Sequence, residues 1–232
     1  KDIVPYLMKM ERGSLLFIDE IHRMNRKVQE YMLTVIEDFR LDIVIPATKT
    51  TQGETVTMNL PKFTLVGATT EMGELVQPFL DRFKLKHYMR PYEPSELAEL
   101  INGNAKKLNV EISEDGMETI AKASRGTPRI SNSLLEWVRD YGIAKGIVGL
   151  QKSQITEALM MQGIDEHGMT PMDRNYLKAL KKLSNGSPIG VNTLCSSLNI
   201  DRKTVEQKIE PFLIRNGYIS KTPKGRILLK EI

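Results

Sequence analysis

The stretch Leu-Leu-Phe-Ile-Asp-Glu-Ile-His-Arg at residues 15–23 indicates an α/β fold. Four apolar residues in a row, without polar alternation, predict a β-strand that is buried on both faces. The strand stops at two carboxylates, Asp19 and Glu20. Ligands of open α/β sheets bind at the carboxyl ends of the strands, so we expect these acids to border a binding site.

The two acids fit the catalytic carboxylates of a nucleotide hydrolase. Mg²⁺ on nucleotide phosphates binds one or two carboxylates together with waters and phosphate oxygens, and Asp19 suits that task. Glu20 would then polarise the attacking water. An Asp-Glu pair after an apolar strand has the form of a Walker B motif. The alternative is a buried strand that ends in two solvated acids without a chemical role.

A second apolar strand, Phe-Thr-Leu-Val-Gly-Ala-Thr-Thr, is predicted at residues 63–70. If the two strands are neighbours in the sheet, Thr69 and Thr70 lie beside the acids. A hydroxyl there can position the attacking water or sense the terminal phosphate. Between the strands we expect a helix capped by Asn25 and then a hairpin at residues 41–60.

The hairpin has a polar tip, which makes it either a contact device or a plain surface loop. After the second apolar strand, the sequence predicts a short helix at residues 75–80 and a final short strand at 85–89. Pro91 and Pro94 then mark a domain boundary.

Only helical patterns follow this boundary as far as about Gly163, at residues 96–108, 113–124, 127–144 and 153–161. The third helix has Thr127 as its N-cap and Pro128 at its first position. Arg129 in that first turn opposes the helix dipole, which disfavours cations there. Phosphate binding is one use for such an arginine, and a surface arginine without a role is the other interpretation.

The composition argues against a membrane span, a disulfide and a histidine or cysteine metal site. The chain is 41% apolar and 27% charged, and it has no apolar run of membrane-spanning length. We therefore expect no membrane and a cytoplasmic, nucleoid-associated location. The three histidines are scattered and Cys195 is the single cysteine, so neither a disulfide nor a histidine or cysteine metal site is expected.

Basic residues gather at the C-terminal end. Residues 171–232 hold 12 Lys and Arg against 5 Asp and Glu, whereas residues 1–170 hold 21 against 24. The pattern there, three short helices followed by a hairpin, predicts a winged helix-turn-helix. We expect DNA contacts from six side chains of the paired helices and the wing: Arg202, Lys203, Lys208, Lys221, Lys224 and Arg226. A solvated charged face, or a winged helix that binds only protein, is the alternative.

The phosphate-binding half of a nucleotide site is missing from the 232 residues. A P-loop needs Gly-x-x-x-x-Gly-Lys-[Ser/Thr], and the nearest match, at residues 163–170, has Met169 in place of the lysine and no preceding strand. We therefore expect this chain alone to bind ATP poorly and to be inactive as a hydrolase.

Six motifs in order carry a resemblance to a known family: residues 16–23, 37–43 (Glu-Asp-Phe-Arg-Leu-Asp-Ile), 63–70, 81–83 (Asp-Arg-Phe), 125–130 (Arg-Gly-Thr-Pro-Arg-Ile) and 222–226 (Thr-Pro-Lys-Gly-Arg). Together they closely resemble the RuvB family, the bacterial Holliday-junction branch-migration motors of the AAA+ class. The resemblance runs from the first residues to the last. It implies the C-terminal part of an AAA+ P-loop NTPase sheet domain at residues 1–91, a helical lid at 92–164 and a winged-helix DNA-binding domain at 165–232.

The resemblance also implies roles for single residues, with ATP and Mg²⁺ as cofactors. Asp19 and Glu20 match the Walker B pair, with Asp19 holding Mg²⁺ through water. Thr70 matches sensor 1, and Arg129 matches sensor 2, which touches the γ-phosphate from the lid. Arg82 matches the arginine finger that enters the neighbouring subunit's nucleotide.

The family's partners follow in the same way. The hairpin at residues 41–60 corresponds to the one that docks a RuvA-like junction-binding protein, the subunits form a homo-hexameric ring, and the winged helix holds the duplex DNA arms of four-way junctions. The chain departs from the family at Glu71 and Leu80, where arginines are usual, and in its hairpin tip. Another AAA+ machine, such as a clamp loader or a transcription activator, and a non-enzymatic winged-helix regulator on the same scaffold are the competing interpretations.

Overall fold

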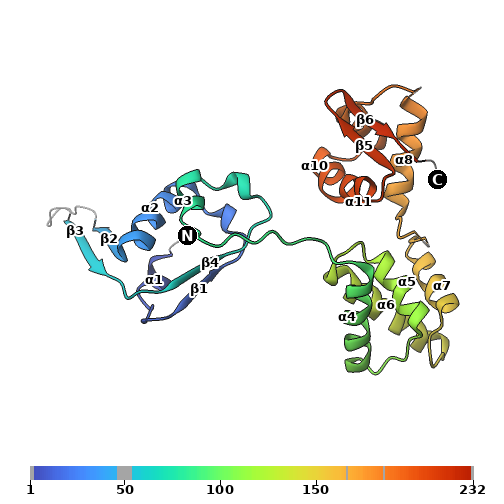
Figure 1. Cartoon of the computed structure of the whole chain (residues 1–232), viewed down its shortest axis with the longest axis horizontal. Coiled ribbons are helices and arrows are strands. Elements are labelled where there is room, and N and C mark those ends of the chain that lie inside the picture. The colour runs from blue at the N-terminus through green and yellow to red at the C-terminus, as the bar shows by residue number, and fades with distance from the viewer. Residues whose placement is uncertain (1–2, 46–53, 166, 185, 231–232) are drawn as a thin grey trace. The chain divides into compact units, whose positions relative to one another are not determined.

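The computed structural model describes residues 3–45, 54–165, 167–184 and 186–230 (Figure 1). The chain divides into two compact units, residues 1–88 and residues 89–232. Each unit is described by itself.

The first unit is built on a parallel pair of strands. β1 (Leu15–Ile18) pairs with β4 (Thr64–Gly67), so the two predicted strands are neighbours with their carboxyl ends together, as expected. Helix α2 (Arg26–Asp38) begins where the Asn25 side chain accepts a hydrogen bond from the Val28 N–H at 2.9 Å, which confirms the predicted cap.

One face of this pair carries the core of the first unit. Apolar residues of α2, of α1 (Val4–Leu7) and of α3 (Gln77–Asp81) pack there against the inner side chains of the strands. Two 3₁₀ turns, η1 (Ile21–Arg23) and η2 (Met72–Glu74), complete the connections at the strand ends. The buried apolar residues of this core are Leu7, Ile21, Met32, Val35, Leu41, Leu60, Leu75 and Phe79.

Two predictions for this unit are wrong. β1 is not buried on both faces, because Leu15 and Phe17 are 62% and 57% exposed. In the described part of the chain β1 has only β4 beside it, and the helices cover a single face of the pair. Residues 85–89 form no strand, and Leu85 and Met89 are exposed. Alternating residues become a strand only where a neighbouring strand takes their backbone hydrogen bonds, and the described residues offer none here.

The predicted hairpin is present. β2 (Arg40–Ile45) and β3 (Glu54–Asn59) are antiparallel, with Arg40 opposite Asn59 and Ile45 opposite Glu54. Residues 46–53, which contain the predicted polar tip, lie outside the described residues.

The second unit opens with four helices, α4 (Pro94–Lys107), α5 (Glu114–Ala123), α6 (Pro128–Lys145) and α7 (Lys152–Met161). Each lies within two residues of its predicted range. Thr127 is the N-cap of α6 and Pro128 its first residue, as expected. The four helices share one apolar core, to which Trp137 adds a hydrogen bond from its indole N–H to the Ala158 carbonyl at 2.7 Å.

Three helical segments and a hairpin follow, in the predicted winged arrangement: α8 (Pro171–Ser184), α9 (Val191–Leu198), α10 (Arg202–Thr204) continuing through η3 (Val205–Ile209) into α11 (Glu210–Arg215), then β5 (Ile219–Thr222) and β6 (Gly225–Leu228). η3 is a π-helical turn. Pro211 has no N–H to donate to the preceding turn, which explains the wider turn there. A side chain at Gly225 would lie 2.5 Å from the Ile189 carbonyl oxygen, so the close approach of the wing to that segment requires glycine.

In the described ranges, no helix has the length and apolarity that a membrane span requires.

Candidate nucleotide and DNA sites

The two acids lie where β1 ends. Glu20 has a left-handed backbone conformation, with φ of +49°, and its N–H donates a hydrogen bond to Asp19 Oδ1 at 3.0 Å. Backbone bonds fix this turn against the neighbouring strand: Ala68 N–H donates to the Ile18 carbonyl at 3.0 Å, and Ile21 N–H donates to the Ala68 carbonyl at 2.9 Å. A non-glycine residue in the left-handed region stores strain, which is common where a side chain must be aimed at a site.

Thr70 lies beside Glu20, as the parallel pairing of the strands predicted. Its hydroxyl donates to Glu20 Oε2 at 3.3 Å. Gly67 packs against the end of the Ile21 side chain, since a Cβ there would lie 2.9 Å from Ile21 Cδ1. The structure thus brings together Asp19, Glu20 and Thr70.

His22 is a member of this cluster that the sequence did not indicate. Its Nδ1 lies 3.2 Å from Glu20 Oε2 and 2.9 Å from Thr69 Oγ1, and only 11% of its side chain is exposed. A carboxylate can only accept, so the contact with Glu20 favours the tautomer that carries its proton on Nδ1. The 3₁₀ turn at residues 21–23 turns His22 back toward Glu20, and no spacing rule for helices or strands would have placed it there.

Arg82 is the C-cap of α3, and its guanidinium forms an ion pair with Glu37 of α2. Both side chains are nearly half exposed. Exposed ion pairs of this kind contribute little to stability, about 0–1 kcal/mol, so a stronger anion can displace Glu37. Arg82 is therefore held at the surface of the first unit without being buried there.

Arg129 is the second residue of α6 and is exposed. Its guanidinium has no hydrogen-bond or ion-pair partner within the described ranges of the chain. An unneutralised cation next to free helical N–H groups suits an anionic ligand. Arg129 belongs to the second unit and the acids to the first.

Five of the six predicted DNA-binding side chains are exposed: Arg202, Lys203, Lys208, Lys221 and Lys224. Glu206 lies between the helix and the wing and holds two of them, with Arg202 Nε at 3.0 Å and Lys221 Nζ at 3.7 Å. The hydrogen bonds from Arg202, followed by those from Arg226 and the charge of Lys221, lower the pKa of Glu206 to about 2. Glu206 is therefore ionised at neutral pH, and it partly neutralises the basic face.

Arg226, the sixth, is buried, so the expectation that it is exposed with the other five was wrong. Its side chain is 7% exposed, and its Nε donates to Glu210 Oε1 at 2.7 Å while its Nη2 donates to Glu210 Oε2 at 3.0 Å. Tyr176 donates its hydroxyl proton to Glu210 Oε1 at 3.0 Å, and burial raises the pKa of Tyr176 strongly. This buried network of Arg226, Glu210 and Tyr176 joins the wing to α11 and α8.

Three family models match consecutive stretches of the chain. They are described as the Holliday junction DNA helicase RuvB P-loop domain (residues 1–89), the RuvB AAA lid domain (92–165) and the RuvB C-terminal winged helix domain (166–231). The chain belongs to the RuvB family. Its first unit is thus part of an AAA+ P-loop sheet domain, and its second unit comprises the AAA lid and the winged helix.

Named RuvB proteins align with nearly the whole chain. The Holliday junction branch migration complex subunit RuvB of Rhodopirellula baltica is 42% identical, over 98% of this chain and 62% of its own length, and that of Helicobacter acinonychis is 43% identical, over 97% and 66%. The chain therefore spans about two thirds of the RuvB proteins it matches. The structure of the Thermotoga maritima RuvB Holliday junction branch migration motor superimposes with a TM-score of 0.80 at 36% identity, covering 97% of this chain and 70% of the other.

Proposed function

We propose that this chain is the motor part of a subunit of a Holliday-junction branch-migration complex, which couples ATP hydrolysis to translocation of duplex DNA in recombination and repair. The observation that carries the proposal is the cluster at the end of β1, where Glu20 contacts both Thr70 and His22 next to Asp19. The names of the relatives support the same function.

The residues of the cluster fit Mg²⁺ and a nucleoside triphosphate. Within the described segments, no group of three His, Cys, Asp or Glu side chains could hold a metal ion by itself. Asp19 would supply one carboxylate to Mg²⁺. That is the usual protein share where waters and phosphate oxygens complete the shell. When bound, Mg²⁺ neutralises charge that develops on the phosphates.

The chain's own groups then have separate tasks. Glu20 accepts a proton from the attacking water, and its left-handed backbone and the contact from His22 aim its carboxylate. Thr70 orients the same water or reads the γ-phosphate. Arg129 binds the γ-phosphate from the lid.

Arg82 acts in the neighbouring subunit of a homo-hexameric ring, where it leaves Glu37 and stabilises the transition state. Arginine fingers contribute about 10³- to 10⁵-fold to the rate, so hydrolysis would depend on assembly of the ring. The hairpin of β2 and β3 would dock a RuvA-like protein. A cytoplasmic, nucleoid-associated location follows from this role.

Arg202, Lys203, Lys208, Lys221 and Lys224 hold the duplex arms of four-way junctions through the phosphates. Such contacts carry little sequence information, and binding should weaken steeply as salt rises.

No P-loop sequence occurs in the 232 residues, so we expect the chain alone not to hydrolyse ATP at ordinary rates. Turnover should appear in a protein that carries a P-loop segment ahead of residue 1. In that protein Glu20→Gln should abolish turnover and leave nucleotide binding intact, because the amide keeps its shape but cannot take the proton. Equal loss of binding and turnover would contradict the role given to Glu20.

A further inference from the structure

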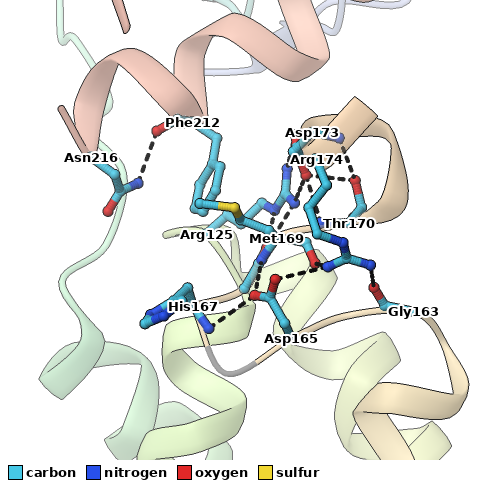
Figure 2. Close-up of polar contacts among 11 residues, drawn as sticks. Arg125, Gly163, Asp165, His167, Met169, Thr170, Asp173, Arg174, Phe212 and Asn216 are labelled. Carbon is cyan, nitrogen blue, oxygen red and sulfur yellow. Dashed lines mark hydrogen bonds and ion pairs between the residues drawn. The ribbon is translucent and has the colours of Figure 1, made fainter. Parts of the chain in front are cut away.

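Arg125, a lid residue in the loop between α5 and α6, reaches across to the winged helix (Figure 2). Its Nε and Nη2 donate to the Gly168 carbonyl at 3.0 and 2.7 Å. Its Nη1 donates to Asp173 Oδ1 at 3.3 Å, and its Nη2 forms an ion pair with Asp173 Oδ2. One edge of the guanidinium therefore binds the backbone ahead of α8 and the other binds the Asp173 carboxylate in the first turn of α8.

The same residue also contacts α11. The Arg125 guanidinium carbon lies 4.1 Å from the centre of the Phe212 ring, and Arg215 Nη2 donates to the Arg125 carbonyl at 2.7 Å. Arg125 has a left-handed backbone, with φ of +56°. Such a conformation in a non-glycine residue persists only where surrounding contacts fix it.

Asp173 makes this contact hard to open. Its side chain is 1% exposed and also accepts from the Thr170 N–H at 2.7 Å and from the Thr170 hydroxyl at 2.5 Å. If Arg125 withdrew, a buried carboxylate would lose its cation, which is strongly unfavourable.

The segment that joins the two domains is folded by a second arginine. Arg174 donates to Asp165 Oδ2 at 2.8 Å, to the Gly163 carbonyl at 2.8 Å and to the Met169 carbonyl at 2.9 Å (Figure 2). One side chain of α8 thus holds three described residues of this segment, Gly163, Asp165 and Met169.

Arg125 is four residues before Arg129, and α6 begins at Pro128 between them. One short stretch therefore carries both Arg129, which is exposed and suits a phosphate, and Arg125, which binds the winged helix. A rotation of the lid about its nucleotide would be delivered to the winged helix through this stretch.

We propose that Arg125 and Asp173 form an interdomain clasp, which makes lid and winged helix one rigid lever and passes nucleotide-dependent movement of Arg129 to the DNA-holding domain. Both are positioning residues and touch no substrate. The rigid contact between lid and winged helix does not depend on the proposed function. The transmission of nucleotide-dependent movement through that contact rests on the proposed function.

The clasp can be tested on the 232-residue chain by electron–electron distance measurement. Spin labels at Lys107→Cys in the lid and Lys182→Cys in the winged helix, in a Cys195→Ser background, report the interdomain distance distribution; both lysines are exposed. We expect a narrow distribution, broadened about twofold or more by Asp173→Asn or by Arg125→Lys, since small interdomain contacts otherwise permit movement. Arg139→Ala is the matched control, because its ion pair with Asp140 stays within the lid. The clasp would be overturned if the parent chain gave a broad interdomain distance distribution. It would also be overturned if Asp173→Asn and Arg125→Lys both folded and gave distributions as narrow as that of the parent.

Coupling is tested in a protein that carries a P-loop segment, as base pairs migrated per ATP hydrolysed. Asp173→Asn should leave ATP turnover within about twofold and lower this ratio by roughly tenfold, the size of a typical coupling between sites. A ratio equal to that of the parent would overturn the coupling role. If the parent neither hydrolyses ATP nor migrates junctions, the proposed function fails, and the distance measurement still decides the clasp.

Discussion

Arg226→Met tests whether Arg226 stabilises the winged helix or contacts DNA. In the structure its guanidinium is buried against Glu210 and also donates to Glu206 at 3.1 Å. Methionine fills a similar length without charge, so the substitution leaves Glu210, 2% exposed, without its cation. In the described part of the chain, Glu210 would keep the hydrogen bond that it accepts from the Tyr176 hydroxyl.

Removal of one partner from a buried ion pair costs about 3–5 kcal/mol. For a unit of about 150 residues, each kcal/mol lowers the melting temperature by about 2–4 °C, so the expected decrease is about 6–20 °C. Glu210→Gln added to Arg226→Met should recover part of this loss, because it removes the unpaired charge.

The assay pairs thermal unfolding, followed by circular dichroism, with duplex binding, followed by fluorescence anisotropy. Lys224→Met, on the same hairpin and exposed, is the matched control: it should unfold within about 0.5 kcal/mol of the parent and bind duplex more weakly. If Arg226→Met unfolds like the parent and weakens DNA binding as Lys224→Met does, the buried role of Arg226 is refuted.

Two further substitutions test the basic face of the winged helix and the exposed Arg82 of the first unit. Glu206→Gln should free Arg202 and Lys221 for the phosphates and so strengthen duplex binding. The slope of log affinity against log salt concentration should become steeper, by up to about the value of one phosphate contact. An unchanged affinity and slope would contradict the neutralising role of Glu206. Because the pKa of Glu206 is lowered to about 2 in the folded chain, its stabilising contribution is complete above about pH 4.5 and declines as pH falls toward 2, so Glu206→Gln should also flatten acid unfolding in that window. Arg82→Ala, in a P-loop-bearing protein, should abolish turnover in uniform rings and recover part of it when mixed with Glu20→Gln subunits that supply their own finger; no recovery would argue against action between subunits.

Local signals predicted much of the fold. The Asn25 cap, the Pro128 start of α6 and the two apolar strands each depend on a few neighbouring residues, and the structure has them where expected. The meeting of Glu20 with Thr70 was also predictable, because parallel neighbouring strands end at one edge of a sheet.

Features that depend on distant partners were not predictable. Nothing in residues 15–18 says whether a second layer covers Leu15 and Phe17. Arg226 looks like any wing cation until Glu210 is found beneath it. The partner of Arg125 is 48 residues away, and only the folded chain shows that the guanidinium meets Asp173.

The central claim is tested most directly by ATP-dependent migration of a synthetic four-way junction, with and without a RuvA-like protein, in a protein that carries a P-loop segment ahead of residue 1. We predict that the parent converts the junction to duplex products only with ATP, and that Glu20→Gln binds the junction without moving it. A parent that hydrolyses ATP and binds the junction, yet leaves it in place with the RuvA-like protein present, would contradict the claim.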